Sequence, residues 1–270
     1  MNQVMTGKSI GFIGAGIMGT ALIKSLLNSS IRAEQIFISE KNEIRAQEVV
    51  NDYQVKSCSI HEIARSCEVI FLAVKPQDLE NTLLELSTDL EQGALLISIA
   101  AGKTTKFIES KLKSKNAVVR VMPNTPAQIG KGVSVISAGT NSTNSDMELT
   151  KVLLENTGLV VEVEESQQDA VTALSGSGPA YFFSFVESMI KSGVSLGLSM
   201  DTATKLAIGT ITGAAAMLTE SGLDAATLRK NVTSPNGTTA AALEVFNDNK
   251  LDEIIEKAMA AAKKRSQELA

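Results

Sequence analysis

The chain has 270 residues, 44% of them hydrophobic, which is enough material for one large domain or two ordinary domains with a packed core. Its net charge of −5 argues against nucleic acid as a partner, because a nucleic-acid-binding protein needs clustered Lys and Arg. No stretch approaches the roughly 20 apolar residues of a membrane helix, so we expect no membrane partner either.

The residues that build metal centres and histidine-based catalytic triads are scarce. The two cysteines, Cys58 and Cys67, lack metal-site spacing, and His61 is the single histidine. We expect no metal site, a surface position for His61 and two reduced, packed thiols in a cytoplasmic protein.

In chain order, the first segment is Lys8 to Leu27, whose hydrophobic period changes from strand-like to helix-like at a GxGxxG motif. In such a motif Gly14 permits the turn, Gly16 lets a pyrophosphate approach the backbone, and Gly19 lets the helix pack on the strand. The unpaired N–H groups that open the helix would face phosphate oxygens. The spacing therefore predicts a dinucleotide-binding loop.

The second strand, predicted over residues 35–39, ends where the adenosine ribose of a bound dinucleotide would lie. Glu40 in this loop would favour the ribose hydroxyls of NAD. Ser39 and Lys41 could instead hold the 2′-phosphate of NADP. The loop alone leaves both cofactors open.

Strand and helix patterns then alternate as far as residue 164, which predicts a doubly wound α/β sheet. Residues 68–74 form a continuous apolar run, typical of a parallel strand buried on both faces. Lys75 follows this strand at the ligand crevice, where it either assists the cofactor or is simply solvated. Two prolines bracket Asn124 and Thr125 in a rigid loop after another strand.

From Ser166 onward only helical periodicity remains, so we place a domain boundary near residue 165, between a dinucleotide-binding domain (1–165) and an all-helical domain (166–270). The aromatic cluster from Tyr181 to Phe185 is most simply interpreted as core. Residues 207–217 are almost uncharged and must be buried on most sides. About 100 residues can hardly enclose them, so we expect a twofold homodimer.

The segment from Asn231 to Leu243 joins two helices and is rich in hydroxyls. Thr238 and Thr239 open the second helix, whose N-terminal field attracts a carboxylate, although an ordinary capped helix start has the same residues. Ser175 and Ser177 open an earlier helix, where they either contact nicotinamide or substrate or merely cap the helix.

Five motifs, in order and over essentially the full length, resemble pyrroline-5-carboxylate reductase. They are GFIGAGIMG, LAVKPQ, VRVMPNTPA, ALSGSGPAY and TSPNGTTAAAL. The resemblance implies the last step of proline biosynthesis, in which NADPH or NADH reduces 1-pyrroline-5-carboxylate to L-proline. It also implies an N-terminal Rossmann domain and a helical dimerisation domain that interlocks in a homodimer, sometimes assembled into larger rings.

The resemblance also assigns residues to roles. The residues that would hold the cofactor pyrophosphate are Gly14, Ala15, Gly16, Ile17 and Met18. Those that would line the nicotinamide side are Ala73, Val74, Lys75 and Pro76. Those that would hold the substrate carboxylate are Ser234, Asn236, Gly237, Thr238 and Thr239. Thr239 would in addition hydrogen-bond the ring nitrogen, which makes it the candidate catalytic residue.

The sequence departs from the family pattern at three places. Asn236 replaces the first of two common glycines, and because Asn tolerates positive φ we expect the loop to persist. Ile60 stands where members often have Asn near the adenine ribose, and Glu40 is unusual beside a 2′-phosphate. Both of these positions leave NAD and NADP open.

Two other functions compete with a reductase of cyclic imines. A hydroxyacid dehydrogenase of similar plan would need an acid/base, commonly a Lys early in the helix after the domain junction. Residues 179–188 have none, and Lys191 comes late. A dinucleotide-binding protein without turnover is the second alternative, which the intact TSPNGTTAAAL loop disfavours. A protonated cyclic imine needs positioning more than a strong acid, which suits a chain with one histidine.

Overall fold

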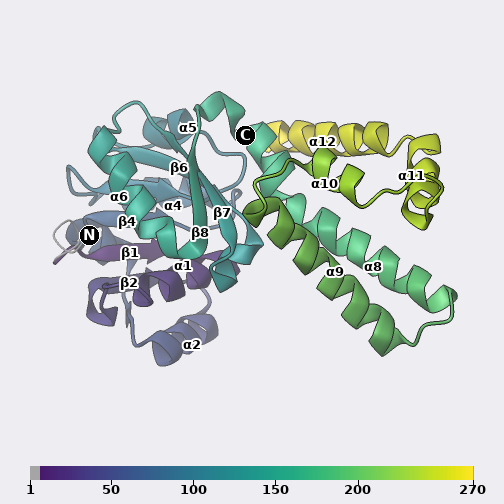
Figure 1. Cartoon of the computed structure of the whole chain (residues 1–270). Coiled ribbons are helices and arrows are strands. Elements are labelled where there is room, and N and C mark those ends of the chain that lie inside the picture. Colours follow the sequence, from purple (N-terminus) through teal and green to yellow (C-terminus); the bar gives the residue numbers. More distant parts are fainter. Residues whose placement is uncertain (1–6, 270) are drawn as a thin grey trace. The chain divides into compact units, whose positions relative to one another are not determined.

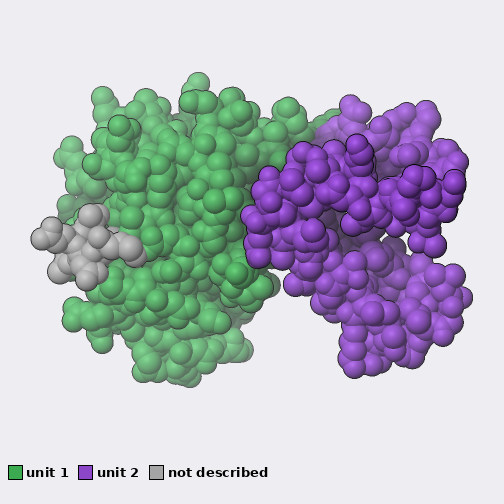
Figure 2. All heavy atoms as spheres, viewed as in Figure 1, with its two compact units in different colours: residues 1–177, 262–270 green, residues 178–261 purple. Residues whose placement is uncertain are grey.

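The computed structural model describes residues 7–269, and the chain divides into two compact units (Figure 2). The sheet unit is Met1–Ser177 together with Ala262–Ala270, and the helical unit is Gly178–Ala261. Residues 262–269 therefore belong with the N-terminal part of the chain.

The sheet unit is built on one eight-stranded sheet in the order β3-β2-β1-β4-β5-β6-β7-β8 (Figure 1). The strands are β1 (Ile10–Ile13), β2 (Ile36–Ser39), β3 (Lys56–Ser57), β4 (Val69–Leu72), β5 (Leu95–Ser98), β6 (Val118–Pro123), β7 (Gly132–Ala138) and β8 (Gly158–Glu162). All neighbours pair in parallel except β6 and β7. The connection from Pro123 to Gly132 is too short for the crossover of a dozen or more residues that parallel strands need, so β7 runs back antiparallel.

Helices cover both faces of the sheet, which confirms the predicted doubly wound architecture. One face packs against α1 (Ile17–Leu27), α2 (Glu43–Tyr53) and α6 (Asn144–Leu154), and the other against α3 (Ile60–Ser66), α4 (Leu79–Leu86) and α5 (Thr105–Ser110). Because strand side chains alternate, Phe12 and Phe71 point into the first layer and stack with ring centroids 4.6 Å apart, while Ile13 and Leu72 point into the second.

After β8 the chain is helical but stays with the sheet unit. A 3-10 turn (Glu165–Gln167) leads into α7 (Gln168–Val171) and then into a π-helical turn (Thr172–Gly176). The last strand ends at Glu162, a few residues before the boundary expected near residue 165, and the compact unit continues to Ser177. A helical pattern in the sequence thus begins about a dozen residues before the change of unit.

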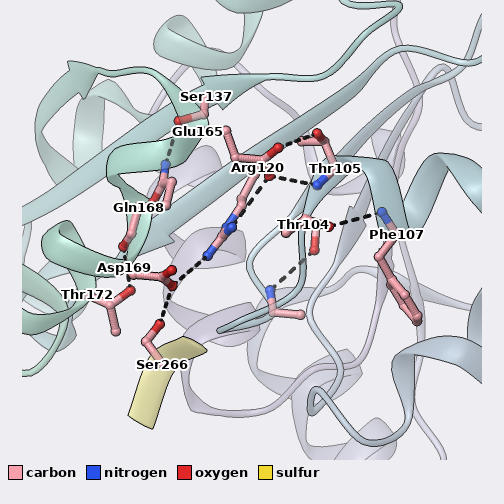
Figure 3. A network of polar contacts seen from close by, with 12 residues as sticks. Thr104, Thr105, Phe107, Arg120, Ser137, Glu165, Gln168, Asp169, Thr172 and Ser266 are labelled. Carbon is pink, nitrogen blue, oxygen red and sulfur yellow. Dashed lines mark hydrogen bonds and ion pairs between the residues drawn. The ribbon is translucent and has the colours of Figure 1, made fainter. Parts of the chain in front are cut away.

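A buried arginine holds this segment against the sheet (Figure 3). Arg120 lies on β6 with 4% of its surface exposed, and its guanidinium nitrogens lie 3.5 Å from Glu165 Oε1 and 3.9 Å from Asp169 Oδ1. Glu165 accepts hydrogen bonds from the backbone N–H and the hydroxyl of Thr105, at 2.7 and 2.6 Å. Ser266, near the end of the chain, donates to Asp169 Oδ1 at 2.7 Å. Four segments distant in the sequence therefore meet at one cation.

The helical unit contains α8 (Gly178–Ser195), α9 (Met200–Glu220), α10 (Ala225–Asn231), α11 (Thr238–Asp248) and the first part of α12 (Leu251–Glu268). Helices α8 and α9 pack against each other at Gly193 and Ala203. The interpretation of the aromatic cluster as core is wrong for the single chain, since Phe182 is 62% and Phe183 67% exposed. In α9 only Ala203 and Ala207 are buried. Among residues 7–269, no helix is both long and apolar enough to cross a membrane.

Candidate functional site

The glycine-rich turn follows β1 at the carboxyl edge of the parallel strands. Gly14 has φ +92°, and its N–H donates to the Ser39 carbonyl at 2.8 Å. A Cβ on Gly14 would lie 2.7 Å from the Ala73 carbonyl oxygen, and one on Gly19 would lie 2.8 Å from the carbonyl of Gly14. The turn and the close helix–strand packing expected from the sequence are therefore present, and both require glycine.

Gly16 differs from its two neighbours in the motif, because a Cβ built on it would meet nothing within 4 Å. It precedes α1 without a side-chain cap, and the first helical hydrogen bond runs from the Thr20 N–H to the Gly16 carbonyl. The N–H groups of Ile17, Met18 and Gly19 are consequently left open, as at any uncapped helix start. This arrangement of open space and aligned donors fits a dinucleotide pyrophosphate.

The end of β2 is joined to this turn by a carboxylate that the sequence did not single out for that contact. Glu40 Oε2 accepts the Ala15 N–H at 2.8 Å, and Glu40 Oε1 accepts the Asn42 N–H at 3.0 Å. Arg45 Nε donates to the Ala15 carbonyl at 2.6 Å. The Lys41 side chain beside them is exposed. The signal for these contacts was the position of Glu40 directly after a strand, but its partner lies 25 residues away.

The end of β4 forms the other wall of the turn. The Ala73 N–H donates to the Ile13 carbonyl at 2.8 Å, and the Ala73 Cβ lies 3.3 Å from where a Cβ on Gly19 would be. Val74 and Pro76 are half-buried, whereas Lys75 is exposed. The structure thus gathers three of the predicted cofactor segments, residues 14–18, 39–41 and 73–76, at adjoining strand ends. Their contacts with a cofactor stay a prediction.

A buried amide fixes the loop after β6. Asn124 is 8% exposed, and its Nδ2 donates to the backbone oxygen and the hydroxyl of Ser175, at 3.2 and 3.3 Å. Its Oδ1 accepts the Val133 N–H at 2.8 Å. A Cβ on Gly176 would strike the Met122 side chain, so the π-helical turn packs tightly here. The Ser175 hydroxyl thus has a structural contact with Asn124, and no pattern in the sequence indicates this pair.

The hydroxyl-rich loop of the helical unit opens α11. Asn236 adopts φ +58°, the left-handed conformation that Asn tolerates better than most residues. A Cβ on Gly237 would collide with the Ser234 hydroxyl oxygen, which lies directly over it. The first helical bond runs from the Ala241 N–H to the Gly237 carbonyl at 3.1 Å. Three main-chain donors, those of residues 238–240, are therefore unpaired.

The side chains of this loop are open as well. Within residues 7–269, no hydrogen bond engages the hydroxyls of Ser234, Thr238 or Thr239, and Gly237 gives α11 no side-chain cap. Asn236 and Gly237 border a cavity of about 780 Å³, whose other walls include Arg229 and Ala240, whereas Ser234, Thr238 and Thr239 do not line it. Unpaired backbone donors and hydroxyls therefore belong to the same short loop, a combination that suits a small carboxylate.

The fold and the glycine turn together define a dinucleotide-binding oxidoreductase of the Rossmann type. Two family models agree with this class: residues 9–102 match "NADP oxidoreductase coenzyme F420-dependent", and residues 165–269 match "Pyrroline-5-carboxylate reductase dimerisation". The pyrroline-5-carboxylate reductase of Haemophilus influenzae is 42% identical over 267 residues, which cover 98% of both chains. The chain belongs to the pyrroline-5-carboxylate reductase family.

Solved structures of the same family are similar throughout. The Coxiella burnetii pyrroline-5-carboxylate reductase superposes with a TM-score of 0.90 at 33% identity and covers 97% of this chain and 98% of its own. The Plasmodium falciparum pyrroline carboxylate reductase, solved with NADP bound, gives 0.88 at 32% identity with the same coverage. The family resemblance identified from the five sequence motifs is confirmed.

Proposed function

We propose that this protein reduces 1-pyrroline-5-carboxylate to L-proline with NAD(P)H, the last step of proline biosynthesis. The observation that carries the proposal is the α11 loop, where Ser234, Thr238 and Thr239 present unpaired hydroxyls beside unpaired backbone donors. Such a loop binds an anionic group of a small substrate. Family membership supplies the substrate, a cyclic imine with one carboxylate.

The proposed reaction does not need a strong acid or base from the protein. When bound, the reduced nicotinamide supplies a hydride. A cyclic imine that arrives protonated on nitrogen is already electrophilic at the carbon that receives it, so catalysis consists largely of holding the substrate in place. In the proposal the donors of residues 238–240 and the Ser234 hydroxyl hold the carboxylate, and the Thr239 hydroxyl hydrogen-bonds the ring nitrogen.

The glycine turn of the sheet unit is the proposed binding site for the cofactor. In the proposal the open N–H groups after Gly16 bind the pyrophosphate, and the segment from Ala73 to Pro76 lines the nicotinamide side. Ser39 and Lys41 stay candidates for the adenosine ribose or its 2′-phosphate. Lys75 is exposed, so the structure restricts its role less than those of the other proposed cofactor-binding residues.

The proposal includes a homodimer formed through the helical unit. Phe182 and Phe183 on α8, and Leu206 and Ile208 on α9, are each more than half exposed in the single chain. Surfaces this apolar mark interaction sites, and a second copy can cover its own equivalent face through a twofold axis. Sedimentation at micromolar concentration tests this. A monomer contradicts the proposed dimer, and a larger species indicates rings of dimers.

The proposed setting is the cytoplasm, where Cys58 and Cys67, both free here, stay reduced.

The decisive variant is Thr239→Val, assayed by cofactor oxidation with 1-pyrroline-5-carboxylate. A hydrogen bond to a charged group contributes about 1.5–3 kcal/mol, so kcat/KM should fall roughly 10- to 150-fold. Thr88→Val is the matched control, because the Thr88 hydroxyl donates to Glu85 and Asp89 within the sheet unit. An unchanged kcat/KM for Thr239→Val removes Thr239 from the mechanism. A wild-type protein that binds cofactor but never oxidises it supports the non-catalytic alternative.

A further inference from the structure

The carboxylate of Glu40 is fixed at the place where the two nicotinamide cofactors differ. In a Rossmann unit the residue after the second strand meets the adenosine ribose, whose 2′ position is a hydroxyl in NADH and a phosphate in NADPH. Glu40 follows the last residue of β2, Ser39. Both of its oxygens are held by backbone N–H groups, those of Ala15 at 2.8 Å and Asn42 at 3.0 Å.

This anchoring keeps the negative charge at the glycine turn. The Ala15 N–H belongs to the turn. The Asn42 N–H belongs to the N-cap residue of α2, and the Asn42 side chain itself accepts the Arg45 N–H. To leave the turn, Glu40 would have to break two charge-assisted hydrogen bonds, which are roughly twice as strong as neutral ones. A carboxylate has about four acceptor sites, so each oxygen can still accept a ribose hydroxyl.

A 2′-phosphate at the same place meets the opposite conditions. It has no proton to donate to Glu40 and carries roughly −1.5 to −2 charges at pH 7. Like charges brought together in this way oppose binding. Within residues 7–269 neither nearby cation forms an ion pair with Glu40, so its charge is not neutralised at the turn: Arg45 Nε donates to the Ala15 carbonyl at 2.6 Å, and Lys41 is exposed to solvent.

We propose that Glu40 makes this site select NADH over NADPH. The proposal rests on the proposed dinucleotide function of the glycine turn and adds the choice between the two cofactors. It makes Glu40 a specificity-determining residue that accepts the ribose hydroxyls and repels the 2′-phosphate, while Ser39 and Lys41 are not sufficient to hold that phosphate.

Equilibrium titration of nicotinamide fluorescence, without substrate, tests the proposal on the full-length protein. The wild type should bind NADH at least about tenfold more tightly than NADPH. Glu40→Gln should lower the Kd for NADPH and raise that for NADH, bringing the two within about threefold. Glu40→Asp, which keeps the charge, should still prefer NADH. Glu43→Gln is the control, because it removes an exposed carboxylate in the first turn of α2 and should leave the ratio within about twofold of the wild type.

The outcomes separate this proposal from the function on which it rests. If Glu40→Gln weakens both cofactors by the same factor, Glu40 only supports the turn and the selectivity proposal is overturned. A wild type that binds NADPH as tightly as NADH, or more tightly, overturns it as well, while the dinucleotide function stands. If neither cofactor binds at millimolar concentration, the proposed function itself falls and this proposal falls with it. The ratio of kcat/KM for the two cofactors should follow the ratio of their Kd values.

Discussion

Replacing Arg120 by methionine tests whether the buried ion cluster stabilises the protein. Methionine fills most of the space of the arginine stem but leaves the carboxylates of Glu165 and Asp169 without their cation. In the wild type the Arg120 guanidinium nitrogens lie 3.5 and 3.9 Å from these two carboxylates. Thr105 would still donate two hydrogen bonds to Glu165, and Ser266 one to Asp169. The substitution therefore isolates the charge that joins these groups.

The magnitude follows from how buried the partners are. Removing one member of a buried ion pair costs about 3–5 kcal/mol, because a desolvated charge is left behind. The Arg120 side chain is 5% exposed, but those of Glu165 and Asp169 are 24% and 26% exposed, so water can rehydrate them in part. We therefore expect the low end of the range, about 3 kcal/mol, which lowers Tm by roughly 6–12 °C in a protein of this size.

Circular dichroism melting at one fixed protein concentration measures the effect, since the Tm of an oligomer depends on concentration. The companion is the triple variant Arg120→Met, Glu165→Gln and Asp169→Asn, in which no charge is stranded. It should recover at least half of the lost Tm. A single variant that melts within about 2 °C of the wild type refutes the reasoning, and so does a triple variant no more stable than the single one.

Two further predictions concern glycine and cysteine. Gly14→Ala places a Cβ 2.7 Å from the Ala73 carbonyl oxygen at φ +92°, and it should raise the Kd for NADH, measured by fluorescence titration, more than about tenfold. Gly93→Ala is the control, because Gly93 has a similar φ of +99° but open space around it. This control should lose about 1–2 kcal/mol of stability with no change in Kd. Equal Kd values for the two variants would contradict the steric argument. Burial raises the pKa of the Cys67 thiol to about 11, so the rate of its alkylation by iodoacetamide should rise about tenfold per pH unit up to that value. The same raised pKa stabilises the folded protein below the ordinary thiol pKa, and this contribution to the free energy of unfolding should be lost as the pH rises from 9 to 11. Fast alkylation of Cys67 in the folded protein at pH 7 would show that the thiol is not buried.

Much of the sheet unit could be predicted because its signals are local. The change of hydrophobic period at Gly14 to Gly19 and the apolar run ending at Val74 each specify an element and its end within a few residues. The antiparallel direction of β7 was not predicted, although the short connection from Pro123 to Gly132 contains that information. Hydrophobicity shows which residues are buried in a strand but not in which direction the strand runs.

The helical unit shows a different limit. The apolar character of α8 and α9 was visible in the sequence, but whether Phe182 and Phe183 are covered by their own chain or by another copy was not. An apolar helix face has the same pattern in both cases. Only the structure of a single chain, in which Phe182 and Phe183 are left exposed, separates the two.

The polar contacts were the least predictable part of the site. Arg120 interrupts an apolar strand, which indicates that it must have a partner, but Glu165 lies 45 residues further on and Ser266 much further. Glu40 was recognised as unusual for its position, yet its hydrogen bond to the Ala15 N–H depends on two loops that meet only in the folded sheet. Pairings of this kind are decided by topology rather than by local sequence.

The return of the last residues to the sheet unit has a consequence for how the chain folds during translation. Leu269 packs over Gly102, where a Cβ would lie 2.8 Å from that of Leu269, and Ser266 completes the cluster around Arg120. The 84 residues of the helical unit are synthesised before this segment, which takes roughly 4–17 s at 5–20 residues per second. Throughout that interval the nascent sheet unit lacks the contacts that residues 262–269 later make with Gly102 and Asp169.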